Sequence, residues 1–138
     1  MTPASEAYDE LCAYTLSHGG SDFLHQHVID AFGAQHEPEQ ATPIQLTFAL
    51  VGLYLHVEQG VSGRDVQRVH AALARRTRSW PRFNVPARRG DLTAADVLAS
   101  PDGSERDAAI ERWCAAVWNA YAESRGEVIA LLEAHGMG

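Results

Sequence analysis

The chain has 138 residues, of which 46% are hydrophobic and 21% charged, and it carries a formal net charge of −7 and two cysteines. This size and composition predict one ordinary globular domain, residues 1–138, and two cysteines are too few for a disulfide framework or a four-cysteine zinc site. The N-terminus lacks the features of a signal peptide, and the longest apolar stretch, FALVGLYLHV, is half of the roughly 20 residues that a membrane span needs. We therefore expect a cytoplasmic protein with free thiols and no membrane contact.

The first half of the chain has four segments with helical periodicity and clear boundary signals. Ser5 is a predicted N-cap of the first helix, and Ser21 or Asp22 of the second. Thr42 before Pro43 opens the third helix, and the pattern Ser-x-x-Asp from Ser62 opens the fourth. The predicted helices end at about Ser17, His36, Gly60 and Thr77.

The second half begins with SWPRFNVPARRGDL, whose two prolines and glycine predict a loop that crosses the surface. Thr93-x-x-Asp96 predicts a capped short helix through Ala99, and a long helix starts near Ser104. A break near Ser124 precedes a terminal helix through Ala134. No alternating strand is present, so we predict an all-α fold, a compact bundle of four main helices plus shorter helices with antiparallel up-down connections.

The segment FLHQHVIDAFGAQH places three histidines on one predicted helix. At 100° per residue, His25 and His36 fall on the apolar side, whereas Gln26, His27 and Asp30 fall on the other. His25 and His36 are 11 residues apart, about 16 Å along a helix, so they cannot share an ion. We therefore expect His25 to face the core, and His27 and Asp30 to face away from it.

Two further histidines face inward. His56 follows Gly52 on a stripe of small residues along the third helix, which predicts either close helix packing or space for a ligand, and His70 lies among the apolar residues of the fourth. If consecutive helices alternate in direction, His25, His56 and His70 converge towards one end of the core. This arrangement predicts a three-histidine metal site for zinc or iron, completed by Cys12, Asp30, Gln67 or water.

Two alternatives to a metal site stay open. In the first, each histidine is a core residue bonded to a carbonyl or an amide. In the second, the region is a metal-free pocket with Gln26, His27, His36 and Gln67 as candidate ligand-binding residues. No HExxH, ExxH or Cys-x-x-Cys motif favours a metal, and no residue pattern settles whether the protein is an enzyme.

Charge is distributed unevenly along the chain. Eight of the eleven arginines but only one of the eighteen acidic residues lie between Arg64 and Arg89. The segment either pairs with the protein's own acidic helices or binds an acidic protein partner or a second copy in a homodimer, which makes a non-enzymatic interaction module the alternative function. Nucleic acid is disfavoured because no recognition module is present, and Trp80 and Phe83 are expected to pin the loop to the helices.

Several blocks together resemble a known family. They are YTLSHG, FLHQHVIDAFGAQH, TFALVGLYLHVEQGVSGRDVQRVH, WPRFNVP, LTAADVL and ERWCAAVWNAY. In this order they are similar to a bacterial family of small uncharacterised proteins, domain of unknown function 5946, from roughly Tyr8 to Leu132. The resemblance implies a compact helical domain and no particular activity. Some relatives carry two closely spaced cysteines near the N-terminus, where this chain has only Cys12.

Overall fold

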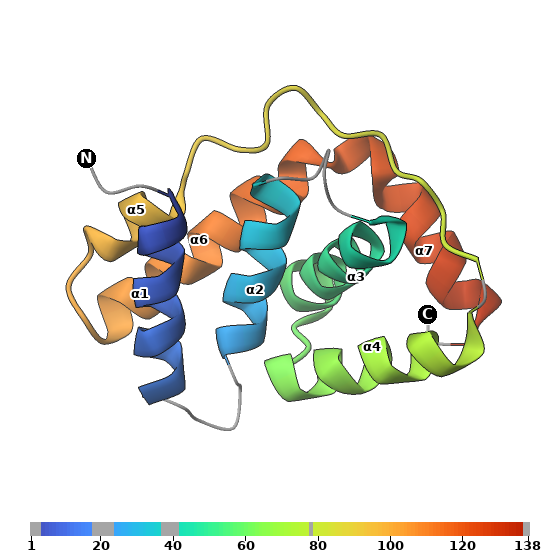
Figure 1. Cartoon of the computed structure of the whole chain (residues 1–138), viewed down its shortest axis with the longest axis horizontal. Helices are drawn as coiled ribbons and strands as arrows, with labels where there is room; N and C mark the ends of the chain where they lie inside the picture. Colours follow the sequence, from blue (N-terminus) through green and yellow to red (C-terminus); the bar gives the residue numbers. More distant parts are fainter. Residues whose placement is uncertain (1–3, 18–23, 37–41, 78, 137–138) are drawn as a thin grey trace.

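The computed structural model describes residues 4–17, 24–36, 42–77 and 79–136, and every regular element in these ranges is helical (Figure 1). The predicted all-α fold is confirmed. The elements are α1 (Ala4–Ser17), α2 (Leu24–Gln35), α3 (Pro43–Gln59), α4 (Gly63–Arg76), α5 (Ala94–Leu98), α6 (Ser104–Ala120), the 3-10 turn η1 (Ala122–Ser124) and α7 (Arg125–Ala134).

Local side-chain chemistry sets most helix boundaries, as the sequence predicts. The Thr42 hydroxyl accepts a hydrogen bond from the Gln45 N–H, and the Gln45 side-chain oxygen accepts one from the Thr42 N–H. At α4 the Ser62 hydroxyl accepts a hydrogen bond from the Asp65 N–H, and Gly60 ends α3 with a positive φ of 67° that a glycine adopts without strain. The structure differs at α1, which begins at Ala4, and the predicted caps at 21 and 22 lie outside the described residues.

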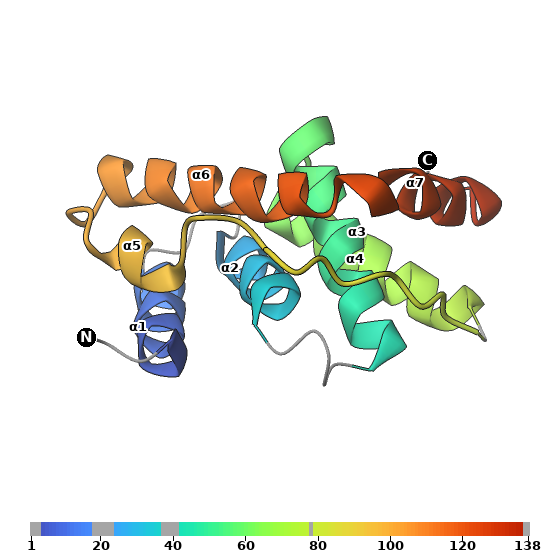
Figure 2. The same ribbon diagram turned by 90° about the horizontal axis from the view of Figure 1, so that it is seen from above.

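Helix α3 is the centre of the molecule, as its nearly continuous apolar sequence predicts. Its buried residues run from Leu46 to Leu55, and it contacts α2, α4, α6 and α7. Figures 1 and 2 show α1 and α2 running in opposite directions, whereas α3 crosses α2, and α6 and α7 follow one another along the length of the molecule. Because α3 crosses α2, these two helices are not the antiparallel neighbours that the predicted convergence of His25, His56 and His70 requires.

A strap without regular structure, residues 79–93, runs from the end of α4 to α5 (Figure 2). Within this strap the Phe83 side chain is buried, and Trp80 packs edge-on against Phe48 of α3, with ring centroids 5.4 Å apart. The prediction of a surface loop held by these two aromatic side chains is confirmed.

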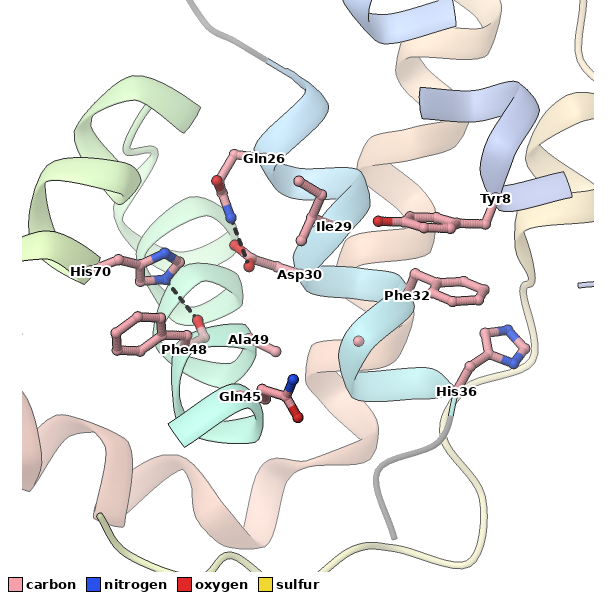
Figure 3. Close-up of a pocket in the computed structure, with 11 residues that line it drawn as sticks. Tyr8, Gln26, Ile29, Asp30, Phe32, His36, Gln45, Phe48, Ala49 and His70 are labelled. Atoms are coloured by element: carbon pink, nitrogen blue, oxygen red, sulfur yellow. Dashed lines mark hydrogen bonds between the residues drawn. The ribbon is translucent and has the colours of Figure 1, made fainter. Parts of the chain in front are cut away.

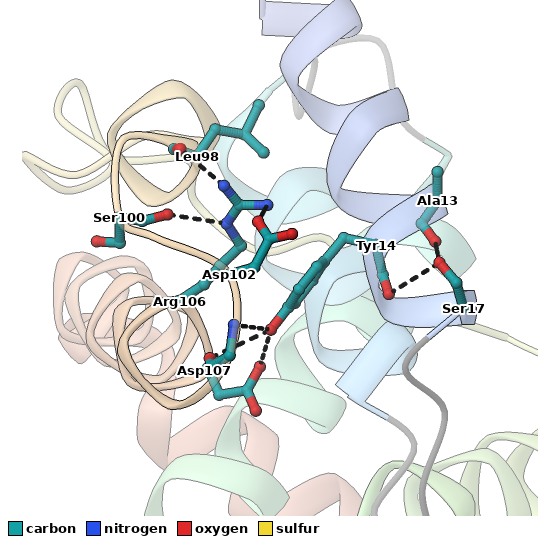
Figure 4. Close-up of polar contacts among 9 residues, drawn as sticks. Ala13, Tyr14, Ser17, Leu98, Ser100, Asp102, Arg106 and Asp107 are labelled. Atoms are coloured by element: carbon teal, nitrogen blue, oxygen red, sulfur yellow. Dashed lines mark hydrogen bonds and ion pairs between the residues drawn. The ribbon is translucent and has the colours of Figure 1, made fainter.

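Polar contacts join α1 to the start of α6 (Figure 4). The Tyr14 hydroxyl donates to Asp107 at 2.6 Å and accepts from the Gly103 N–H at 3.1 Å. Arg106 lies over the Tyr14 ring, 5.0 Å from its centroid, and pairs with Asp102 at 2.6 Å. These contacts hold α1 against the start of α6.

Within the described residues, no helix has the length and apolar character needed to cross a membrane.

Candidate functional site

A cavity of about 590 Å³ lies among the first four helices (Figure 3). It is bounded by α1, α2, α3 and α4, and the strap supports one of its walls through Trp80. The lining residues are Tyr8, Gln26, Ile29, Asp30, Phe32, Gly33, His36, Gln45, Phe48, Ala49 and His70. None of them is an arginine, and Asp30 is the one carboxylic acid among them.

Asp30 is the central polar group of the cavity. It is 2% exposed, and its Oδ1 accepts a hydrogen bond of 3.0 Å from the Gln26 amide. Its Oδ2 has no hydrogen-bond partner in the described part of the chain. Burial raises the pKa of this carboxyl well above its usual value, against the smaller opposing effect of the Gln26 bond. The cavity wall therefore contains a carboxyl group that favours its neutral form and has one oxygen without a partner among the described residues.

Gly52 of α3 makes room for that carboxyl. A Cβ placed on Gly52 would lie 1.8 Å from Asp30 Oδ2 and 2.6 Å from its Cγ, well inside contact distance. Gly52 allows α2 to approach closely, as one of the two readings of the small-residue stripe predicts. Ala49 and Gln45, one and two turns before Gly52 on α3, line the cavity.

Aromatic rings form two walls of the cavity. On one side Tyr8 stacks on Phe32 with centroids 4.0 Å apart, and His36 packs on Phe32 at 4.5 Å. On the other side Phe48 and His70 are parallel at 4.6 Å. The His70 ring is held by a 2.8 Å hydrogen bond between its Nε2 and the Phe48 carbonyl, and burial lowers its pKa, which keeps it neutral.

The prediction that Gln26, His27 and Asp30 face away from the core is wrong. Their side chains are between 1% and 7% exposed, whereas His25 and His36 on the predicted core side are only half-buried. Helix α2 contacts α1, α3, α4 and α6, so both of its sides are covered. The polar side is buried because Gln26 and Asp30 bond to each other and because α3 covers them, with Gly52 beside Asp30 and His56 stacked on His27. An isolated helix does not reveal this cover.

His27 and His56 form a second polar group beside the cavity. Their rings stack with centroids 3.4 Å apart, and His56 Nε2 lies 2.7 Å from a carboxylate oxygen of Glu111 on α6. Burial, and then the neighbouring His56, lower the pKa of His27 to about 4, so His27 is neutral. The contact with His56 lowers the pKa of Glu111. Because the two rings are stacked, their nitrogen lone pairs lie in nearly parallel planes and do not converge on one point. This geometry is unsuited to binding one metal ion.

The histidines predicted to share a metal lie in three different places. His25 Nδ1 is 3.1 Å from the Thr15 hydroxyl, His56 contacts Glu111, and His70 contacts the Phe48 carbonyl. In the ranges described, no three histidine, cysteine, aspartate or glutamate side chains are grouped so as to hold a metal ion. The three-histidine metal site therefore stays a prediction.

The remaining candidate residues divide between the cavity and its surroundings. Gln26, Asp30 and His36 line the cavity together with His70, whereas Gln67 is exposed on α4. Cys12 is half-buried on α1, with its pKa raised chiefly by burial. Of the predicted site residues, the cavity lining thus brings together Gln26, Asp30, His36 and His70.

Sequence reasoning missed the aromatic lining and Glu111. Tyr8 and Phe32 lie in apolar stripes that indicate core positions, and nothing distinguishes a core aromatic from one that borders a cavity. Glu111 had no signal, since a single glutamate on an amphipathic helix is typical of a solvated surface.

Comparison with known proteins gives one match. The model of a family of unknown function, DUF5946, matches residues 5–122. No curated protein and no solved structure matches the chain.

Proposed function

The chain belongs to DUF5946, a family of unknown function, and we propose that it is a binding protein for a small organic molecule that occupies the cavity around Asp30. The observation that carries the proposal is the carboxyl of Asp30, which borders the cavity, is almost fully buried and has one oxygen without a hydrogen-bond partner in the described residues. A buried polar atom without a partner destabilises the folded protein by about 1–3 kcal/mol, and a ligand that supplies a hydrogen-bonding partner would recover this free energy.

The size and chemistry of the cavity support this proposal. Small-molecule sites commonly measure about 300–1,000 Å³ and combine apolar walls with a few polar groups. The cavity of about 590 Å³ has this composition, with Tyr8, Phe32 and Phe48 as apolar walls and Gln26 and Asp30 as polar groups. Their neighbours hold the polar groups in place, because Gln26 bonds to Asp30 and the Asp30 carboxyl packs against Gly52.

A ligand screen with a blocked variant tests the proposal. We would screen a fragment library of mixed charge by protein-observed NMR against the wild-type protein and Ile29→Trp, in which a large ring fills part of the cavity. Leu16→Trp is the matched control, because Leu16 is 60% exposed on α1 and does not line the cavity. The proposal expects fragments that shift cavity amides in the wild type and in Leu16→Trp but not in Ile29→Trp. Fragments that bind all three proteins equally, or none at all, would refute it.

The functions predicted from the sequence alone give different results in parallel assays. Metal binding by His25, His56 and His70 predicts stoichiometric metal in the purified protein. Binding of an acidic partner or self-association through residues 64–89 predicts complexes whose affinity falls steeply with salt concentration and is unaffected by chelators. Arg75 and Arg82 are exposed and so accessible to such a partner.

A further inference from the structure

The charge of the cavity lining narrows the class of ligand. An anionic ligand needs a cationic partner, and the lining residues include no arginine. The acid that is present, Asp30, would repel a carboxylate or phosphate whenever it ionises. Acidic ligands are therefore disfavoured, which leaves neutral molecules and cations.

The side chains around Asp30 provide no positive charge that could balance its ionised carboxylate. Tyr8 of α1 has a raised pKa, mainly because of burial, and is neutral. Cys114 of α6 is a buried thiol whose pKa burial also raises. His70 of α4 is neutral, and α3 presents Gly52. No cationic side chain among the described neighbours thus faces the carboxyl, so its ionised form has no partner of opposite charge within the protein.

We infer, on the basis of the proposed function, that the ligand is a small organic cation, a protonated amine with an apolar body, whose ammonium group pairs with Asp30. Burial of an ionised carboxylate is unfavourable unless it is paired, and an ammonium ion supplies both the opposite charge and the missing hydrogen-bond donor. The side-chain oxygen of Gln26, whose amide nitrogen donates to Asp30, can accept a further N–H group. The aromatic walls suit the apolar body, and aromatic rings also attract organic cations.

Matched series of ligands test this inference. Ethylamine, isobutylamine and 2-phenylethylamine would be titrated beside the corresponding alcohols and carboxylates, with cavity amide shifts followed by NMR. We expect at least one amine to bind ten times more tightly than its alcohol, and the carboxylates not to bind. Asp30→Asn keeps the shape of the side chain but cannot ionise, and it should weaken amine binding at least tenfold while leaving alcohol binding unchanged.

The outcomes separate the inference from the proposal on which it rests. If alcohols or carboxylates bind as tightly as amines, or if Asp30→Asn binds amines normally, the ligand class is wrong and the cavity still binds small molecules. The same conclusion holds if the library yields cavity ligands that are not cations while every amine fails. If neither the fragment library nor the ligand series shifts cavity amides, both the cation inference and the proposed binding function are refuted.

Discussion

Replacement of Gly52 by alanine tests the contact on which the candidate site depends. Alanine normally stabilises a helix relative to glycine by about 1 kcal/mol. Here the added Cβ would lie 1.8 Å from Asp30 Oδ2 and 3.2 Å from Oδ1, so the whole carboxyl must move. Both residues are buried at the contact between α2 and α3, which leaves little room for that movement.

The expected loss follows from two effects. Overpacking a buried contact destabilises a protein by about 1–3 kcal/mol. Displacement of the carboxyl also breaks the hydrogen bond from Gln26, which leaves a buried amide unpaired for about 1–3 kcal/mol more. After subtracting the helix-propensity gain, we expect Gly52→Ala to lower the free energy of unfolding by about 1–5 kcal/mol.

Urea unfolding of single and double variants measures this effect. On an Asp30→Ala background the carboxyl is gone, so Gly52→Ala should become neutral or stabilising, with a coupling energy of at least about 2 kcal/mol. Gly126→Ala in α7 is the control, because its Cβ would meet nothing within 4 Å and should change stability by less than about 1 kcal/mol. Equal losses from Gly52→Ala with and without Asp30 would refute the contact.

Three further predictions concern individual side chains. Tyr14→Phe removes the hydroxyl that donates to Asp107 and should lower the free energy of unfolding by about 1–3 kcal/mol in urea titrations, whereas an unchanged midpoint would contradict the contact. Since the pKa of His27 is lowered from 6.5 to about 4, the unfolded chain binds this proton at a higher pH than the folded protein does. The free energy of unfolding should therefore be highest above pH 6.5 and decline by up to about 3 kcal/mol towards pH 4. The variant His27→Phe should flatten that decline in urea titrations at several pH values. If the predicted metal site exists, elemental analysis should find near-stoichiometric zinc or iron in the untagged protein and none in His56→Ala; metal-free wild-type protein would end that prediction.

Local signals in the sequence were sufficient for the secondary structure. Thr42 before Pro43, the glycine at position 60 and the Thr93-x-x-Asp96 box act within a few residues of themselves, so they mark the same helix boundaries in any tertiary context. The apolar sequence of α3 likewise identifies the central helix. The helix α1 begins two residues before the start that a cap at Ser5 predicts, within the range over which helix ends fray.

The candidate site depended on the tertiary structure. A helical projection shows which residues of α2 share a side, but it does not show that neighbouring helices cover both sides. His27 could be buried because His56 stacks on it, and Asp30 because Gly52 leaves space for its carboxyl. The sequence therefore determined the helices and their ends through short-range hydrogen bonds and periodicity. Only the crossing of α2 and α3 decided which polar groups meet, because the partners lie more than twenty residues apart and their contact depends on how the helices cross.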